Sequence, residues 1–160
     1  MKWKNKYFIP ISIILLLVLI KKSSNKLKKI VKNQLIRGDD DFGSGAFGAN
    51  RSGHTHQGID IITNVGENIY SPISGKVTRF PSPYANETAW TGIEIVNDKY
   101  SVKIFYVKPI VSISKIVEPG EQIAIAQNIK LKYGQTMTNH AHLEVRDSKT
   151  QQLLNPTNLF

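Results

Sequence analysis

The four histidines of the chain stand in two short clusters, and an acidic residue follows each cluster closely. The first cluster spans residues 54–56, and Asp60 comes four positions after His56. The second cluster spans residues 140–142, and Glu144 stands two positions beyond it. Residues two apart on a strand point to the same face of a sheet, so each cluster can present its polar side chains on one side.

Two strands equipped in this way can offer three nitrogen and oxygen ligands to one metal ion. Two histidines and one carboxylate, with a fourth position left open, form the ligand set of a catalytic zinc site. A nearby histidine that does not bind the metal can move protons or stabilise an oxyanion. The alternative is four scattered surface histidines, but their grouping into two matched clusters favours a metal site. The spacing alone leaves open which three groups bind.

The residues around these histidines resemble the signatures of lysostaphin-type, LytM-like zinc metallopeptidases. Residues 56–60 (HQGID) resemble the H-x-G-x-D signature of that family, and residues 140–144 (HAHLE) resemble its H-x-H-x-E signature. The resemblance covers about residues 47–160. Further stretches match in the order of the family, namely Phe47-Gly48, Arg51, Gly66, Ile69–Pro72, Gly75–Val77, Pro119–Ala124 and Asn155-Pro156.

This resemblance implies a role for each residue of the two clusters. His56, Asp60 and His142 would bind Zn²⁺, and His140 would be a catalytic histidine. The implied substrates are peptide cross-links of bacterial peptidoglycan. Two further polar residues of the matching motifs, Arg51 and Glu144, would contact the substrate or support the metal ligands.

One strand departs from the family pattern. The family has a second catalytic histidine in a Y-x-H-L strand, whereas residues 105–109 read FYVKP, so Lys108 stands in its place. The leukocyte cell-derived chemotaxin branch shows the same replacement, with the zinc-binding fold but no established peptidase role. A lysine with its ordinary pKa of about 10.4 is a fixed cation, which can stabilise an oxyanion but does not readily act as a base. A solvent-exposed Lys108 without a role in the site is the alternative.

Two functional hypotheses follow from these motifs. The first is a membrane-anchored zinc metalloendopeptidase that acts on peptidoglycan cross-links, with activity weakened by the replacement at Lys108. The second is a catalytically degenerate zinc-binding module that recognises cell-wall peptides or a protein partner. A host-interaction role of the chemotaxin type rests on resemblance alone.

The remaining sequence predicts a small, mostly β domain over residues 47–160. Short apolar runs alternate with polar residues, and Gly, Pro and Asn separate them, which is typical of an antiparallel β-sandwich or barrel-like sheet. The lysostaphin-type resemblance implies the same architecture, of the duplicated-hybrid-motif kind. The predicted strands are Gly58–Thr63, Gly75–Phe80, Gly92–Val96, Val102–Val107, Gln122–Gln127 and Ala141–Arg146.

The N-terminus carries a different signal. Residues 7–20 are apolar and have lysines on both sides. They are fewer than the roughly 20 residues that cross a bilayer as a helix, but snorkelling lysines can close the gap. No small-x-small cleavage site follows, so residues 1–22 are expected to be a single transmembrane anchor rather than a cleaved signal. Residues 23–46 are expected to form a basic juxtamembrane helix, over 23–37, and a Gly- and Asp-rich linker.

The charge distribution limits the classes of partner. The formal net charge is +9, but residues 1–37 hold ten basic and no acidic side chains, and residues 38–160 hold eleven basic against twelve acidic ones. A nucleic-acid-binding domain would carry the positive charge itself, so no nucleic-acid partner is expected. We expect the domain to lie outside the cytoplasm, where peptidoglycan is, although the lysines after residue 20 argue for the opposite orientation. The chain has no cysteine, so any metal site must use histidine and carboxylate.

Overall fold

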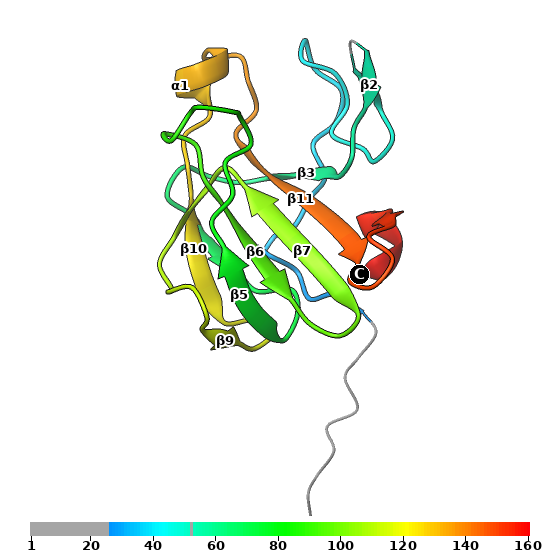
Figure 1. Ribbon diagram of the computed structural model, residues 1–160. Helices are drawn as coiled ribbons and strands as arrows, with labels where there is room; N and C mark the ends of the chain where they lie inside the picture. Colours follow the sequence, from blue (N-terminus) through cyan, green and yellow to red (C-terminus); the bar gives the residue numbers. More distant parts are fainter. Residues whose placement is uncertain (1–25, 52) are drawn as a thin grey trace, which may run out of the picture.

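The computed structural model describes residues 26–51 and 53–160 (Figure 1). The expected transmembrane anchor, residues 1–22, lies outside the described residues. In the described part of the chain, no helix is long and apolar enough to cross a membrane.

The described strands form three antiparallel sheets, which confirms the prediction of a mostly β domain. The largest sheet has the order β12-β11-β7-β6-β5-β9, and β3 also pairs with β11. Its strands are β3 (Ile59–Ile62), β5 (Gly75–Arg79), β6 (Gly92–Val96), β7 (Tyr100–Phe105), β9 (Ile116–Val117), β11 (His140–Asp147) and β12 (Leu153–Leu154).

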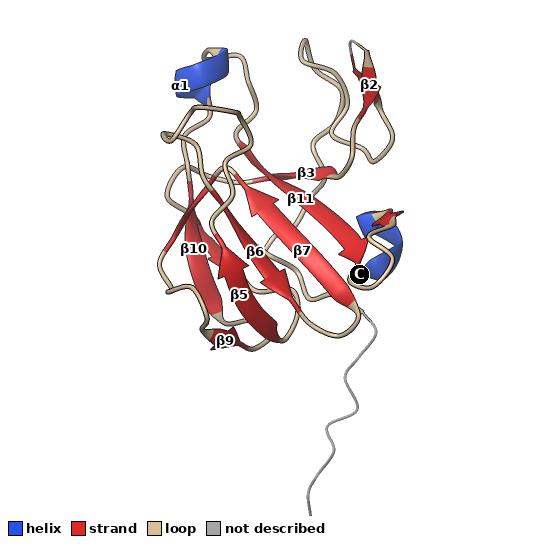
Figure 2. Cartoon of the chain, in the orientation of Figure 1, coloured by secondary structure: helices blue, strands red, loops and turns tan. Residues whose placement is uncertain are grey.

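The second sheet has the order β4-β10-β8, with β4 (Asn68–Tyr70), β10 (Gln122–Ala126) and β8 (Val107–Pro109). The third sheet consists of β1 (Asn50–Arg51) paired antiparallel with β2 (His54–Thr55). The helical elements are short, namely α1 (Lys130–Tyr133) and the 3₁₀ helix η1 (Pro156–Leu159). Figure 2 shows loops together with α1 and β2 at the end of the large sheet where β11 begins.

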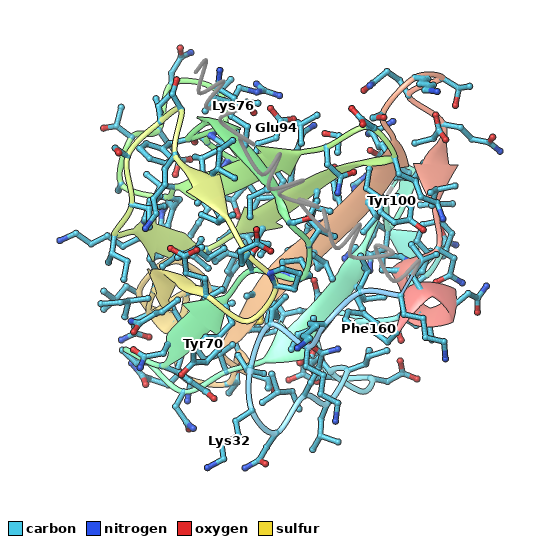
Figure 3. All side chains as sticks on the ribbon, turned by 90° about the horizontal axis from the view of Figure 1, so that it is seen from below. Lys32, Tyr70, Lys76, Glu94, Tyr100 and Phe160 are labelled. Atoms are coloured by element: carbon cyan, nitrogen blue, oxygen red, sulfur yellow. The ribbon has the colours of Figure 1, made fainter. Side chains whose placement is uncertain are left out.

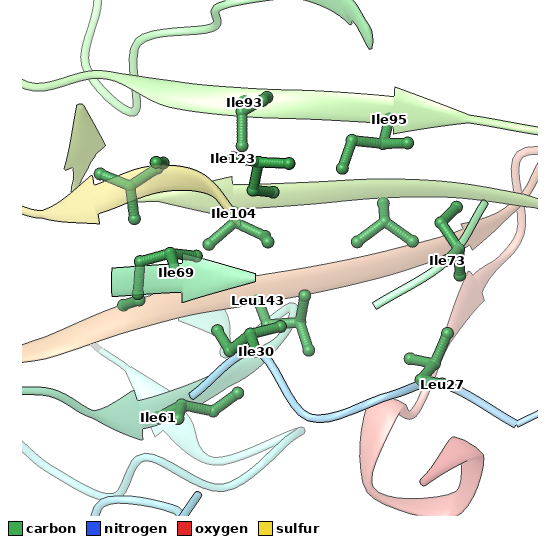
Figure 4. Packing of buried hydrophobic residues seen from close by; sticks show 14 of the residues in the cluster. Leu27, Ile30, Ile61, Ile69, Ile73, Ile93, Ile95, Ile104, Ile123 and Leu143 are labelled. Atoms are coloured by element: carbon green, nitrogen blue, oxygen red, sulfur yellow. The ribbon is translucent and has the colours of Figure 1, made fainter. Parts of the chain in front are cut away.

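The core lies between the large sheet and the second sheet, and branched aliphatic side chains fill it (Figure 4). In β6 the alternation expected of a strand is clear, since Ile93 and Ile95 are fully buried in this core. Glu94 lies between them and contacts Arg79 instead. Ile69 and Ile123 of the second sheet are also fully buried. Each such side chain contributes about 1.5–3 kcal/mol to stability when it leaves water.

The segment before residue 38 corrects one prediction. The helix expected over residues 23–37 is not formed in its described part, because residues 26–37 run as irregular chain along the domain. Leu27, Ile30 and Val31, whose spacing suggested a helix, are buried in the domain core instead. Their backbone hydrogen bonds go to the domain as well, for example from Tyr70 N to Ile30 O at 2.8 Å. The folded unit therefore begins before residue 47.

The lysines of this segment remain on the surface. Lys28, Lys29 and Lys32 are exposed, and with Tyr70 and Phe160 they line a shallow hollow. Figure 3 shows Lys32, Tyr70 and Phe160 in the view from below. The basic character of the segment is thus a surface property of the domain rather than one face of a separate helix.

Candidate metal centre

The pairing of β3 with β11 brings the two histidine clusters together. In this antiparallel register His142 stands opposite Asp60, and both side chains lie on the same face. His56 reaches them from the loop before β3, where its backbone is held by a hydrogen bond from its own N–H to Ala49 O at 2.8 Å. Gly58 permits the close approach, because a Cβ there would lie 2.3 Å from Leu143 O and 2.8 Å from His142 Nε2.

Three ligand atoms converge at this point. His142 Nδ1 lies 2.9 Å from Asp60 Oδ1 and 2.9 Å from His56 Nε2, and His56 Nε2 lies 3.1 Å from Asp60 Oδ1. Around a tetrahedral zinc ion with bonds of about 2.0–2.1 Å, neighbouring ligand atoms are about 3.3 Å apart. An expansion of a few tenths of an ångström would therefore admit zinc. His56, Asp60 and His142 could hold a metal ion, as the resemblance implied.

The ring nitrogens of His56 and His142 that face away from the site have polar partners of their own. His56 Nδ1 lies 2.8 Å from Ala46 O, which accepts its proton and leaves Nε2 free as a ligand. His142 Nε2 lies 3.4 Å from Glu144 Oε1, which leaves Nδ1 facing the site. Such outer partners select the tautomer and fix the ring orientation of a metal-binding histidine. Glu144 thus contacts the outer side of His142, because residues two apart on β11 lie on the same face of the sheet.

Asp60 is almost fully buried and carries the negative charge of the centre. Burial acts to raise its pKa, but the ring nitrogens of His142 and His56 beside Oδ1 outweigh burial and hold the pKa far below its usual value. Burial acts to lower the pKa of His142, yet hydrogen bonds to Asp60 and Glu144 outweigh it and raise the pKa to about 9. The second carboxylate oxygen of Asp60, Oδ2, faces away from the histidines, toward Arg37 at 3.0 Å and Arg51 at 3.3 Å.

His140 stands beside the three ligands. Its Nδ1 lies 2.7 Å from Thr138 O, and its Nε2 lies 3.7 Å from Asp60 Oδ1, which is farther than the ligand atoms lie from one another. Burial lowers the pKa of His140, so that the ring is neutral at pH 7. The edge-to-face ring contact with Tyr106, at a centroid distance of 5.6 Å, supports this orientation. A neutral imidazole in this position can accept or donate a proton at Nε2.

A cavity of about 590 Å³ opens above the centre. One wall is aromatic and was not identified from the sequence as part of the site. Tyr84 O–H shares hydrogen bonds with the hydroxyls of Tyr106, at 2.7 Å, and of Tyr133. These three tyrosines come from separate parts of the chain, so no local pattern marks them as a group. Phe42 also lines the cavity and makes an edge-to-face contact with Tyr133 at 6.0 Å.

The remaining residues singled out from the sequence are divided between two places. Arg51 and His54 line the cavity, but His54 is exposed and outside the group of three ligands. Lys108 does not line the cavity. It is exposed on β8 and lines a separate hollow with Trp90 and Leu131. Any role of Lys108 in the site stays a prediction.

Comparison with known proteins relates this arrangement to characterised folds. No protein-family model matches the chain. Leukocyte cell-derived chemotaxin-2 of Mus musculus is 32% identical over 114 residues, which are 71% of this chain and 74% of that protein. The similarity therefore extends over most of both chains.

Two solved structures share the fold at lower identity. A zinc-containing peptidase from Vibrio cholerae superposes with a TM-score of 0.60 and 23% identity, over 84% of this chain and 40% of that one. The antimicrobial peptidase lysostaphin from Staphylococcus simulans superposes with a TM-score of 0.61 and 16% identity, over 85% of this chain and 54% of that one. The chain spans about half or less of these two proteins.

Proposed function

This chain belongs to the lysostaphin-type family, in the branch of leukocyte cell-derived chemotaxin, and we propose that it is a zinc metalloendopeptidase that cleaves peptide cross-links of peptidoglycan. One observation carries the proposal. Three ligand atoms, from His56, Asp60 and His142, converge at the base of an open cavity, and His140 stands beside them. Two histidines and one carboxylate are the ligands of catalytic zinc sites, which keep a fourth position open.

The three metal ligands and His140 would have separate roles in hydrolysis. A zinc ion bound by His56, Asp60 and His142 would act as a Lewis acid toward the carbonyl of a peptide. His140 would move the proton. Its Nδ1 is held at Thr138 O, so its neutral Nε2 is free to take a proton from the attacking water and to return it to the departing amine.

The test is hydrolysis by the full chain in detergent. The chain loaded with zinc is incubated with purified peptidoglycan, and new amino termini are measured by mass spectrometry. Release by the parent chain, and its loss in both Asp60→Ala and His140→Ala, supports the proposal. A chain that holds one zinc ion and releases no new termini from peptidoglycan contradicts it.

That negative result would support a second function, a zinc-binding module that recognises cell-wall peptides or a protein partner. One observation favours it. Lys108 stands where the family has its second catalytic histidine, and it lies outside the cavity. If the chain is an enzyme, this replacement would weaken its activity, because one oxyanion-type group typically contributes about 10²–10³ in rate.

We also propose that the chain is attached to a membrane by its N-terminal apolar stretch, with the domain outside the cytoplasm. The support is the sequence of residues 7–20 and the location of peptidoglycan. Protease added to intact spheroplasts would then digest the domain. Full protection until the membrane is broken would place the domain inside the cell.

A further inference from the structure

A buried arginine from outside the family motifs contacts Asp60, one of the three residues that could hold a metal ion. Arg37 is 3% exposed and lies ten residues before the first matching motif. Its guanidinium binds Asp60 Oδ2 at 3.0 Å, Asp40 Oδ1 at 2.5 Å and Gly43 O at 2.8 Å. The three contacts use both terminal nitrogens, so the side chain has little freedom to turn.

The backbone fixes the same pair of residues a second time. Arg37 N donates to Asp60 O at 2.8 Å, and Asp60 N donates to Gly45 O at 2.9 Å. Gly45 N in turn donates to Arg37 O at 3.2 Å. A Cβ at Gly45 would lie 2.6 Å from Arg37 O and 3.1 Å from Asp60 Cβ, so the three backbones are packed without space for a side chain.

The contacts between the two residues fix the Asp60 carboxylate but do not fully satisfy the buried Arg37 guanidinium. A buried guanidinium costs free energy unless every donor is paired, and Arg37 Nε has no hydrogen-bond partner among the described residues. The arrangement gives the two oxygens of the Asp60 carboxylate different partners. Oδ2 is engaged by Arg37, and also by Arg51 at 3.3 Å, whereas Oδ1 faces His56 and His142.

We propose that Arg37 is a positioning residue for the metal, which holds Oδ2 of Asp60 so that the ion meets Oδ1 alone. A carboxylate that turned to offer both oxygens would fill the fourth position, which a catalytic zinc site keeps open for substrate and water. Arg51 reaches the same oxygen, but its side chain is 18% exposed and its contact is longer. Arg37 therefore supplies the more rigid of the two contacts. The inference rests on the metal site of the proposed function but not on hydrolysis.

The experiment compares Arg37→Met with the parent chain, by zinc affinity and by the visible spectrum of the Co²⁺-substituted protein. Loss of a partner behind a metal ligand typically lowers metal affinity about 10- to 100-fold, and we expect a fall of this size. The cobalt spectrum should weaken in intensity, as it does when four-coordinate cobalt gains a fifth ligand. Asp40→Asn is the matched control, because it removes the negative charge beside Arg37 but keeps an oxygen that can accept a hydrogen bond from the guanidinium, and it leaves Asp60 untouched. It should lower the melting temperature and leave the cobalt spectrum as it is in the parent.

Arg37→Lys provides a second variant in case Arg37→Met fails to fold. A single ammonium cannot serve Asp40 and Asp60 together as the guanidinium fork does, so zinc affinity should fall by a smaller factor than in Arg37→Met. Unchanged zinc affinity and an unchanged cobalt spectrum in whichever of the two variants folds would overturn the proposal. A parent chain that binds no zinc would overturn both the metal site and this role of Arg37. A parent chain that binds zinc but cleaves nothing would contradict only the hydrolytic function.

Discussion

Replacing Gly58 by alanine should disrupt the metal centre without removing any ligand. The added Cβ would lie 2.3 Å from Leu143 O, whereas ordinary contact begins at 3.4 Å, so the two strands must separate by about 1 Å. Metal–ligand distances tolerate only about 0.2 Å. A movement of β3 that is several times larger takes Asp60 away from His142, so zinc affinity should fall at least about 100-fold. Overpacking of this kind also costs about 1–3 kcal/mol of stability.

The assay is thermal unfolding with and without zinc, together with titration of zinc into the metal-free chain. At a zinc concentration of 100 times the dissociation constant, the parent gains about 2.7 kcal/mol of stability, and Gly58→Ala should gain far less. Gly38→Ala is the matched control, because a Cβ at Gly38 meets nothing within 4 Å and its backbone is not in the left-handed region. A Gly58→Ala variant with the zinc affinity and melting temperature of the parent would refute the reasoning.

Three other substitutions test separate parts of the structure. His140→Ala should keep one zinc ion per chain by metal analysis and lose hydrolysis by about 10²–10⁴, and loss of the zinc would show that His140 is a ligand. Ile30→Ala should destabilise the domain by about 2–5 kcal/mol in denaturant unfolding, because this side chain is fully buried. A change below about 0.5 kcal/mol would show that residue 30 belongs to a linker and not to the core. Glu94→Gln should cost about 1–2 kcal/mol at pH 7, because Glu94 accepts hydrogen bonds from Thr78 at 2.8 Å and Arg79 at 2.7 Å. Burial acts to raise the pKa of Glu94, but Arg79 and Thr78 hold it below 4.5, so the difference should persist above pH 4.5 and close as the pH falls further. A gap that stays constant down to pH 3 would contradict this assignment.

The sequence predicted six of the strands because apolar and polar residues alternate locally in them, although the strand expected over Val102–Val107 is interrupted at Tyr106. The buried Ile93 and Ile95 alternate with Glu94, and such a pattern needs no knowledge of the partner strand. The segment before residue 38 shows the opposite case. Its apolar residues have helical spacing, but a short isolated helix is marginally stable, and burial of Leu27 and Ile30 in the core outweighs that preference. Local periodicity could not reveal this competition.

The part of the site that lies on paired strands was predictable from the sequence. Asp60 and His142 meet because β3 pairs with β11 in one antiparallel register, and the resemblance to a family supplied the choice of ligands that spacing left open. Arg37 was not predictable, because its contact with Asp60 spans 23 positions and depends on how an irregular segment crosses β3. No periodic pattern in the sequence encodes such a contact.

The strand that carries Lys108 shows why counting positions along a strand can mislead. Tyr106 and Lys108 are two apart, and regular alternation would place both on one face of the sheet. Tyr106, however, has a φ of 61°, a conformation that L side chains rarely adopt, and it separates β7 from β8. As a result the consecutive residues Phe105 and Tyr106 both line the cavity, whereas Lys108 lines the hollow beside Trp90. A motif aligned through this point therefore gives the residue type at position 108 but not the direction of its side chain.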